Sequence, residues 1–486
     1  MPLRLHYIIL ILVLIFLTSV SKNSVRDQQK DFAVFKSVLL KKEGRLDLHG
    51  PSSEVLNHLE RVETLFKTEL SPLDQFKYYA STLSLIQCGH TQIHPTKDVL
   101  REWLATRNSL PIDFYLIGKR LIVNKRLGDD DSYVHDGKSS YEQVKNIQAG
   151  AEILMIDGLT VPQMMEEISP YMSSDENSID FKYFQASQLF DFYRHMASPF
   201  TKDSVVVQYV YGADTSEIYF ATGTAPVLTM NARLKKNEEE FKIQESNFGS
   251  FKIAQKCGYF RFESFKIAHG KNYDAFLEQS FKKLKLKKID KLIVDLRGNT
   301  GGAMQYSFMR YIVGEGVTLG RYVIEKPKSG IENGHLKKMN SDYLKHKRMS
   351  RIQRRMIRKE NFNDGIIQTK MVDESLIFDG EIVVITDEGT FSSAAILACH
   401  LKTMADAKII GRTAGGSFYA GNAGTLLLEL PKSKMKMFVN PNTFYSHLPQ
   451  VEDPLAIKQP DIELHPLIVK KRDQDQYYFK QAKNAF

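Results

Sequence analysis

The stretch from residue 382 to residue 416 constrains the fold of this 486-residue chain more than any other. Its β-branched run 382–386 predicts a short buried strand, which the turn residues 387–389 end. Apolar residues then recur at helical spacing, and a second apolar run, 407–410, stops at a glycine. The stretch therefore predicts a strand, a tight turn, a helix and a second strand.

Ser392 lies at the predicted start of that helix, directly after the buried strand. Free backbone N–H groups and the positive helix end lie beside such a hydroxyl, which suits a nucleophile whose reaction builds an oxyanion. The alternative is a serine that only caps the helix, as most serines in this position do. The stretch alone favours the cap.

Length and composition indicate a globular protein of two or three domains. The chain is 43% hydrophobic and 25% charged, and its net charge of +9 is too mild to indicate nucleic acid. Much of that charge lies in the run 345–359, which we interpret as a solvated helix, with an anionic partner or membrane surface as the alternative. The cysteines have the spacing of neither a disulfide framework nor a metal site: Cys88, Cys257 and Cys399.

Residues 1–21 have the order of a secretory signal peptide. Arg4 precedes the apolar run 7–17, and small residues follow it. The run is shorter than the roughly 18 to 20 residues that a membrane span needs. We therefore expect an exported protein of the periplasm or cell envelope, with an uncleaved anchor as the alternative.

The region 22–110 is charged and helical. Ser71 and Pro72 begin a helix with a regular apolar stripe, and Gly89 ends it. His90 follows directly, so a rigid element holds it while its ring is free to face a cleft. An exposed or capping histidine is the alternative.

The block 111–225 contains strand patterns and turns, unlike the helical region before it. Its residues 147–169 read as a glycine turn, a strand, an Asp-Gly turn and a helix. This order resembles the carboxylate-binding half of PDZ-like domains, where an extended peptide adds to a strand edge. The rest of the block, including the helical run 181–196, does not match a complete PDZ domain.

Residues 291–313 repeat the strand–helix order of the opening stretch, and the alternating run 257–265 precedes them. Such units imply an α/β fold with a mostly parallel sheet. The glycine loop 297–302 lacks the lysine of a phosphate-binding loop and the spacing of a dinucleotide fingerprint. Its bare N–H groups suit a developing carbonyl oxyanion. Later in the chain, residues 425–439 predict a hairpin.

The chain resembles the C-terminal processing (tail-specific) serine peptidase family, including its tricorn-like branch, in three motifs: DLRGNTGG at 295–302, TFSSA at 390–394 and GRTAGG at 411–416. The resemblance implies a ClpP/crotonase-type core of stacked β-β-α units. It also implies hydrolysis of peptide bonds in peptide or protein substrates through an acyl-enzyme. We expect no cofactor, no metal and no nucleic-acid partner.

The resemblance also implies roles for single residues. Ser392 matches the nucleophile, and His90 matches the base histidine of the tricorn-like branch. A neutral histidine with a pKa of roughly 6.5 suits this task near neutrality. Glu452 matches the late glutamate that completes that branch's tetrad through a bridging hydroxyl, for which Thr91 is the candidate. The N–H groups of the implied oxyanion hole belong to Ser393 and to Gly301 or Gly302.

The chain departs from the family pattern at three places, one of which is Cys88, where the family often has an acidic residue before Gly-His-Thr. Members with a Ser/Lys dyad carry lysine after the Gly411 turn, where this chain has Ser417 or Phe418. The usual glutamate three places after the nucleophile is Ala395. We therefore favour a Ser/His arrangement, with Ser393 as an alternative nucleophile.

The sequence thus predicts an exported serine endopeptidase with His90 as base. The alternative is a catalytically inactive relative that binds peptides, since retinoid-binding interphotoreceptor repeats resemble this fold. The predicted parts are a signal peptide at 1–21, a helical region at 22–110, a PDZ-like peptide-binding domain at 111–225, a catalytic domain at 226–470 and a C-terminal tail at 471–486.

Overall fold

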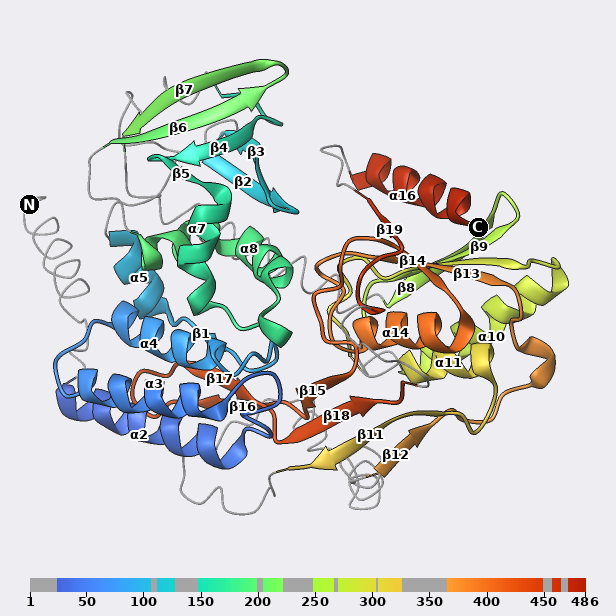
Figure 1. Cartoon of the computed structure of the whole chain (residues 1–486), viewed down its shortest axis with the longest axis horizontal. Coiled ribbons are helices and arrows are strands. Elements are labelled where there is room, and N and C mark those ends of the chain that lie inside the picture. Colours follow the sequence, from blue (N-terminus) through green and yellow to red (C-terminus); the bar gives the residue numbers. More distant parts are fainter. Residues whose placement is uncertain are drawn as a thin grey trace, which may run out of the picture.

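The computed structural model describes residues 24–105, 112–126, 147–198, 204–221, 248–265, 270–302, 305–325, 365–448, 457–464 and 471–486. The run 1–21, the basic run 345–359 and Glu452 lie outside the described residues, so what we predicted for them stays a prediction. Figure 1 shows the N-terminal helices on one side, a small sheet near them, and a larger α/β part that contains the C-terminal end.

The larger part is built on a six-stranded sheet. In spatial order its strands are β19 (Ile462–Glu463), β14 (Lys408–Gly411), β13 (Glu381–Thr386), β10 (Lys291–Asp295), β9 (Cys257–Phe262) and β8 (Gly249–Ala254). Every neighbouring pair is parallel except β8 with β9. The α/β fold and the mostly parallel sheet that the sequence predicted are confirmed.

Helices cover both faces of this sheet. One face is covered by α10 (Gly270–Leu286), α11 (Gln305–Val313) and α14 (Ser393–Ala405), and the other by α16 (Lys471–Ala485). In β10, Leu292 and Val294 pack with the first group, while Ile293 packs with Tyr478 of α16. Because both faces are buried, this strand reads as a continuous apolar run rather than an alternating one.

The helix α16 corrects the expectation of a C-terminal tail at residues 471–486. Its buried apolar residues among those described are Tyr478, Ala482 and Ala485. Polar contacts add to this small apolar face: the Arg412 guanidinium donates to the Tyr478 hydroxyl at 2.8 Å, and Arg297 donates to Asp475 at 2.7 Å. A helix with so few apolar positions has a weak periodic signal, which is why the sequence did not predict it.

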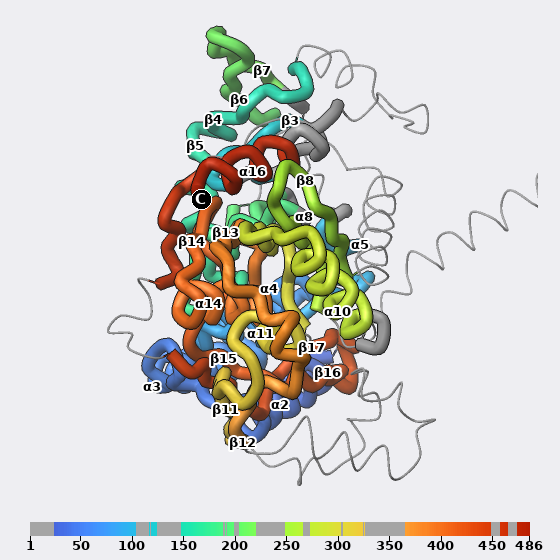
Figure 2. Tube along the Cα trace, turned by 90° about the vertical axis from the view of Figure 1, so that its right-hand side faces the viewer, coloured from blue at the N-terminus to red at the C-terminus, as the bar shows by residue number. Residues whose placement is uncertain are grey.

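The N-terminal helices pack on strands from late in the chain. These helices are α2 (Val25–Lys42), α3 (Ser52–Leu65), α4 (Pro72–Ser84) and α5 (Lys97–Ala105). The strand β1 (Ile93–His94) pairs with β17 (Lys436–Val439), which pairs with β16 (Leu426–Glu429) in the predicted hairpin. Leu428 and Met437 share one hydrophobic core with the helices, and Figure 2 shows the hairpin beside α2. The hairpin therefore joins the segment after His90 to the larger α/β part.

A four-stranded antiparallel sheet continues from this hairpin. Its order is β12 (Gly365–Gln368), β11 (Thr318–Ile324), β18 (Asn442–Ser446) and β15 (Ala420–Ala423). The strands β15 and β18 lie just before β16 and just after β17 in the chain, so the two sheets are connected at both ends of the hairpin.

The block between the N-terminal helices and the larger α/β part forms an antiparallel sheet. Its order is β2 (Ile112–Ile117), β3 (Arg120–Arg126), β4 (Glu152–Ile156), β6 (Ser204–Tyr211) and β7 (Asp214–Ala221), with β5 (Leu159–Thr160) paired to β4. Thr160 and Gln163 form a capping box that begins α7 (Val161–Ile168), and α8 (Ile179–Ala197) follows. The sequence predicted β4, α7 and α8 but not the β6–β7 hairpin. Among the described helices, none is both long and apolar enough to cross a membrane.

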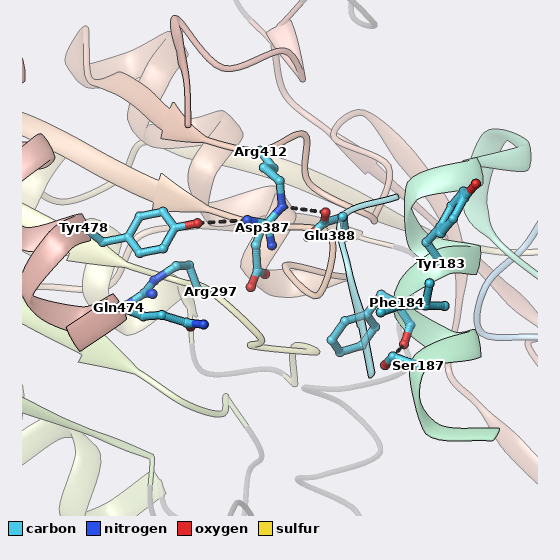
Figure 3. Close-up of a pocket in the computed structure, with 11 residues that line it drawn as sticks. Tyr183, Phe184, Ser187, Arg297, Asp387, Glu388, Arg412, Gln474 and Tyr478 are labelled. Carbon is cyan, nitrogen blue, oxygen red and sulfur yellow. Dashed lines mark hydrogen bonds and ion pairs between the residues drawn. The ribbon is translucent and has the colours of Figure 1, made fainter. Parts of the chain in front are cut away.

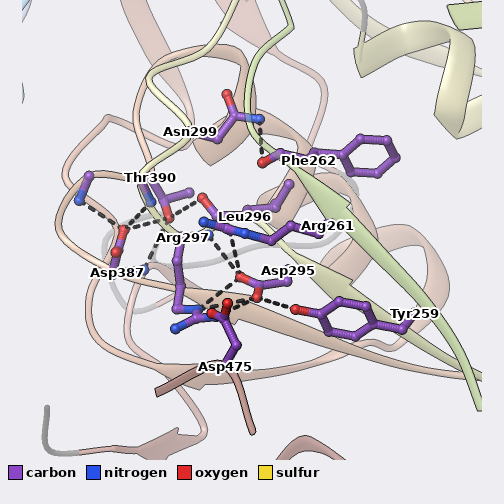
Figure 4. Close-up of polar contacts among 12 residues, drawn as sticks. Tyr259, Arg261, Phe262, Asp295, Leu296, Arg297, Asn299, Asp387, Thr390 and Asp475 are labelled. Atoms are coloured by element: carbon purple, nitrogen blue, oxygen red, sulfur yellow. Dashed lines mark hydrogen bonds and ion pairs between the residues drawn. The ribbon is translucent and has the colours of Figure 1, made fainter. Parts of the chain in front are cut away.

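A buried carboxylate closes the carboxyl end of β10 (Figure 4). Asp295 accepts hydrogen bonds from Arg261 at 2.9 Å, from Arg297 Nη2 at 2.7 Å and from the Tyr259 hydroxyl at 2.7 Å. Burial opposes ionisation, but the two guanidinium groups and these hydrogen bonds outweigh it and lower the pKa of Asp295 to about 2. This cluster fixes the start of the glycine loop at 297–302.

We expect Asp295→Asn to lower the free energy of unfolding by about 3–5 kcal/mol, because it removes the counter-charge of the buried Arg297 and of Arg261. In the wild type, the carboxylate stabilises the fold above pH 3.8, and this contribution is lost as the pH falls toward about 2. Urea unfolding at pH 7 and at pH 3 measures both effects.

The matched control is Asp274→Asn. Asp274 is an exposed partner of Arg310 at 3.2 Å, so its loss costs under about 1 kcal/mol. Equal losses of stability in the two variants would contradict the structural role of the Asp295 cluster.

Candidate active site

Ser392 lies at the sharp turn between β13 and α14, in the position that caps the helix. Its backbone has φ 54° and ψ −127°, a conformation that is strained for a residue other than glycine. The side chain makes no capping hydrogen bond, and Oγ instead lies 2.9 Å from His90 Nε2. The interpretation of Ser392 as a simple helix cap is therefore wrong.

Two glycine loops hold this turn in place. The Phe391 N–H donates to Asn299 O at 3.0 Å, and the Gly416 N–H donates to Thr390 O at 3.2 Å. The Thr390 hydroxyl donates to Leu296 O at 2.9 Å, directly after β10 (Figure 4). The three motifs that carried the resemblance thus form one hydrogen-bonded unit.

Gly301 packs directly on Ser392. Its φ is 97°, and a Cβ added to it would lie 2.7 Å from Ser392 Cβ. Its N–H already donates to Asn299 Oδ1 at 2.9 Å. Within the described part of the chain, the N–H groups of Gly302 and Ser393 have no acceptor. Of the three predicted donors, these two are available to an oxyanion beside Ser392.

His90 follows α4 and is held on both sides by backbone contacts. The Gly89 N–H donates to Asp175 Oδ1 at 2.8 Å, and β1 begins three residues after the histidine. The imidazole lies against the Phe391 ring, with the ring centroids 4.8 Å apart. Burial lowers the pKa of His90, and the Asp175 charge opposes this effect. The neutral imidazole, which can accept a proton, is therefore favoured.

The Thr91 hydroxyl has a partner other than the predicted glutamate. It donates to Glu43 Oε1 at 2.8 Å and accepts from Asn440 Nδ2 at 2.9 Å. Glu43 also accepts from Asn422 Nδ2 at 2.8 Å and from the Asn440 N–H at 3.0 Å. Burial raises the pKa of Glu43 to about 7, although these hydrogen bonds lower it. Glu43 therefore serves to dock the segment that carries the histidine.

The other predicted positions that the structure describes lie in or near the same turn, or in the glycine turn after β14. Ser393 is 2% exposed, and its Oγ has no partner among the described residues, so the alternative nucleophile lacks a base. Ala395 is buried where the family has a glutamate, and Ser417 donates its N–H to Asp175 Oδ2 at 3.0 Å. Glu452 lies outside the described residues, and its role stays a prediction.

Sequence reasoning missed the two buried carboxylates near the histidine. Asp175 is 86 residues from Gly89, and Glu43 is 48 residues from Thr91. Both accept hydrogen bonds from backbone amides or neutral side chains, and such contacts leave no periodic pattern in a single sequence. No motif in the chain could have identified them.

Three side chains at the site are of the kinds that bind metal ions. Cys88, His90 and Asp175 bring a sulfur, a ring nitrogen and a carboxylate oxygen within 4.8 Å of one another. Both Asp175 oxygens already accept N–H groups, and His90 Nε2 faces Ser392. We therefore assign the Asp175 oxygens and His90 Nε2 to hydrogen bonding.

A cavity of about 200 Å³ lies near the turn that carries Ser392, and Figure 3 shows the side chains that line it. It lies between α8 and the loops of the large sheet, and α16 closes one side. The Phe184 ring covers Gly389, where an added Cβ would lie 2.7 Å from it. The labelled lining residues are Tyr183, Phe184, Ser187, Arg297, Asp387, Glu388, Arg412, Gln474 and Tyr478. Three separate parts of the chain therefore meet beside the site.

We expect Gly301→Ala to lower kcat/KM by about a hundredfold or more, because the added methyl displaces Ser392 and the donors beside it. The matched control is Gly298→Ala in the same loop. Gly298 also has a positive φ, of 67°, but a Cβ there meets nothing within 4 Å. Steady-state kinetics of both variants check this prediction, and equal losses would contradict the proximity argument.

Comparison with known proteins gives a family and a shared fold. The model of peptidase family S41 matches residues 256–426. The crystal structure of mature CPAF superposes with a TM-score of 0.56 at 10% identity, over 94% of this chain and 97% of that one. The structure of mature CPAF complexed with lactacystin gives 0.56 at 11% identity, over 95% and 98%. The photosystem II D1 C-terminal processing protease gives 0.40 at 15% identity, over 92% and 96%.

No curated protein matches the chain in sequence. At these low identities the CPAF structures show a similar fold and no more. The family match contains Ser392 and both glycine loops, so the resemblance drawn from the motifs is confirmed. Through residues 256–426, the chain is similar to peptidase family S41.

Proposed function

We propose that this protein is an exported serine endopeptidase that cleaves peptide bonds through an acyl-enzyme on Ser392, with His90 as base. One observation carries the proposal: His90 Nε2 and Ser392 Oγ are 2.9 Å apart although the residues are 302 positions apart in the chain. A serine hydroxyl within hydrogen-bond reach of a histidine ring nitrogen is the nucleophile–base geometry of serine hydrolysis. The fold brings these two residues together from distant parts of the sequence.

The proposed reaction follows from the atoms at the site. Ser392 Oγ attacks the scissile carbonyl carbon while its proton moves to His90 Nε2. The carbonyl oxygen gains negative charge and is stabilised by the N–H groups of Gly302 and Ser393. His90 then gives its proton to the amine nitrogen as the C–N bond breaks. Water then attacks the ester carbon while its proton moves to His90, which gives a proton back to Ser392 Oγ as the ester bond breaks. This step releases the acid.

We also propose that the catalytic part is a ClpP/crotonase-type core and that the β2–β7 block is a PDZ-like peptide-binding domain. The second proposal is supported by the order of β4, β5 and α7, and by the position of β2 at an edge of its sheet. A peptide strand added to such an edge gains backbone hydrogen bonds. The proposed substrate is a peptide or a protein, held by its free C-terminus.

We expect a fluorophosphonate probe to label Ser392 in the wild type and in Ser393→Ala, and to leave Ser392→Ala unlabelled. His90→Gln should slow labelling by about a hundredfold or more, because the serine loses its base. Mass spectrometry of the labelled peptide checks the site. A wild-type protein that stays unlabelled would favour the inactive, peptide-binding relative, and full labelling of His90→Gln would remove His90 as the base.

The labelling rate should fall at acid pH with a midpoint below 6.5, because burial lowers the pKa of His90. The base works only when it is neutral, so the rate is retained above that pKa and lost as the pH falls through it. Rates measured from pH 4 to pH 8 test this, and a midpoint above 6.5 would contradict it.

Peptides with a free C-terminal carboxylate should bind Ser392→Ala about tenfold or more tightly than the same peptides with an amidated C-terminus. The serine variant prevents turnover, so calorimetry measures binding alone. Equal affinities would refute the PDZ-like assignment and leave the peptidase proposal intact.

A further inference from the structure

Asp175 is a buried carboxylate that connects the histidine segment to the glycine turn after β14. It begins the short helix η2 (Asp175–Asn177), between α7 and α8, and is 2% exposed. Its Oδ1 accepts the Gly89 N–H at 2.8 Å, and its Oδ2 accepts the Ser417 N–H at 3.0 Å. Glu176 and Asn177 both have a φ of 54°, so strained backbone holds the carboxylate in this place.

The carboxylate is also close to the ring of His90. An oxygen of Asp175 lies within 4.8 Å of a ring nitrogen of His90. The second ring nitrogen, Nδ1, is buried and has no hydrogen-bond partner in the part of the chain that the structure describes. A negative charge at this distance stabilises the imidazolium that forms when the serine loses its proton.

From this geometry we propose that Asp175 is a positioning residue for catalysis: it fixes the backbone beside His90 and stabilises the protonated ring during the reaction. The inference rests on the proposed Ser392–His90 chemistry. Asp175 itself touches neither the nucleophile nor the substrate, so its effect acts through the histidine.

Other titratable groups near the pair do not take over this task. Glu43 is hydrogen-bonded to Thr91, the residue next to His90. Burial raises the pKa of Glu43 to about 7, so it carries less than a full charge near neutrality. The Asp175 charge keeps the pKa of His90 from falling as far as burial alone would take it. The further groups around these two residues are Cys88, His49, Glu176 and Lys458.

The first test is Asp175→Asn, which keeps one acceptor oxygen and removes the charge. We expect the pKa of His90 to fall by roughly one unit, read from ¹³C-histidine NMR with His90→Gln as the assignment reference. In the same variant, the labelling rate on its plateau at neutral pH should fall about tenfold. The midpoint of the fall in rate at acid pH should move to lower pH by about one unit. If Asp175 had only a structural role, its substitution would lower the plateau rate and leave this acid midpoint unchanged.

The matched control is Asp31→Asn. Asp31 is equally buried and also accepts two backbone N–H groups, from Lys432 at 2.7 Å and Ser433 at 2.6 Å. It lies on α2, in the N-terminal helices, so its loss should destabilise the fold without moving the titration of His90. An equal shift of the His90 pKa in Asp31→Asn would overturn the inference. It would show that any loss of stability moves this pKa.

Glu452→Gln tests the residue that the sequence suggested for the same task. A shift in the His90 titration in Glu452→Gln but not in Asp175→Asn would transfer the role to Glu452. An unlabelled wild type would refute the proposed peptidase function, whereas an unchanged titration in Asp175→Asn refutes the inference alone.

A wild-type measurement guards against an Asp175→Asn variant that fails to fold. If the ring is positioned as inferred, neutral His90 carries its proton on Nδ1 and leaves Nε2 free to accept from Ser392. Long-range ¹H–¹⁵N NMR of histidine-labelled protein reports this tautomer. A predominant Nε2–H tautomer would overturn the inference.

Discussion

The contact between His90 and Ser392 depends on a buried carboxylate that joins the N-terminal helices to the larger α/β part. Glu43 follows α2 and accepts hydrogen bonds from Thr91, next to the histidine, and from Asn440, which follows β17. A buried carboxyl group without such donors costs several kcal/mol, so the helices are stable in this position only when the donors are in place. The site is therefore assembled by domain docking rather than by one local motif.

Hydrophobic packing supplies the other half of that docking. The β16–β17 hairpin extends from the larger α/β part and buries its apolar face against α2 to α5. The pairing of Ile93 with Met437 sets the register of the segment that begins after the histidine. Because side chains alternate across a strand, a slip of one residue would turn this whole face away from its core. Polar and apolar contacts thus specify the same position for His90.

The sequence predicted most parts of the fold that bury their side chains periodically, although not the β6–β7 hairpin, and it missed the parts held by isolated polar contacts. The predicted strand at 382–386 is β13 within one residue, and the predicted helix after it is α14. The glycine loops and Ser392 were found because their chemistry requires local motifs. Asp175 and Glu43 were not, since their partners are amides far along the chain. The helix α16 was missed because arginine contacts replace part of its apolar face.

The strained backbone of Ser392 explains why its side chain does not do what most serines at a helix start do. With an extended φ, the hydroxyl of a capping residue turns toward the N–H groups of the first helical turn. At φ 54°, Oγ turns away from the helix and meets His90. The free-energy cost, of order 1–3 kcal/mol, is offset by the loop hydrogen bonds of Phe391 and Gly416 and by the burial of α14. Backbone strain and the orientation of the Ser392 hydroxyl are therefore one feature of the turn, and the two glycine loops are what sustain it.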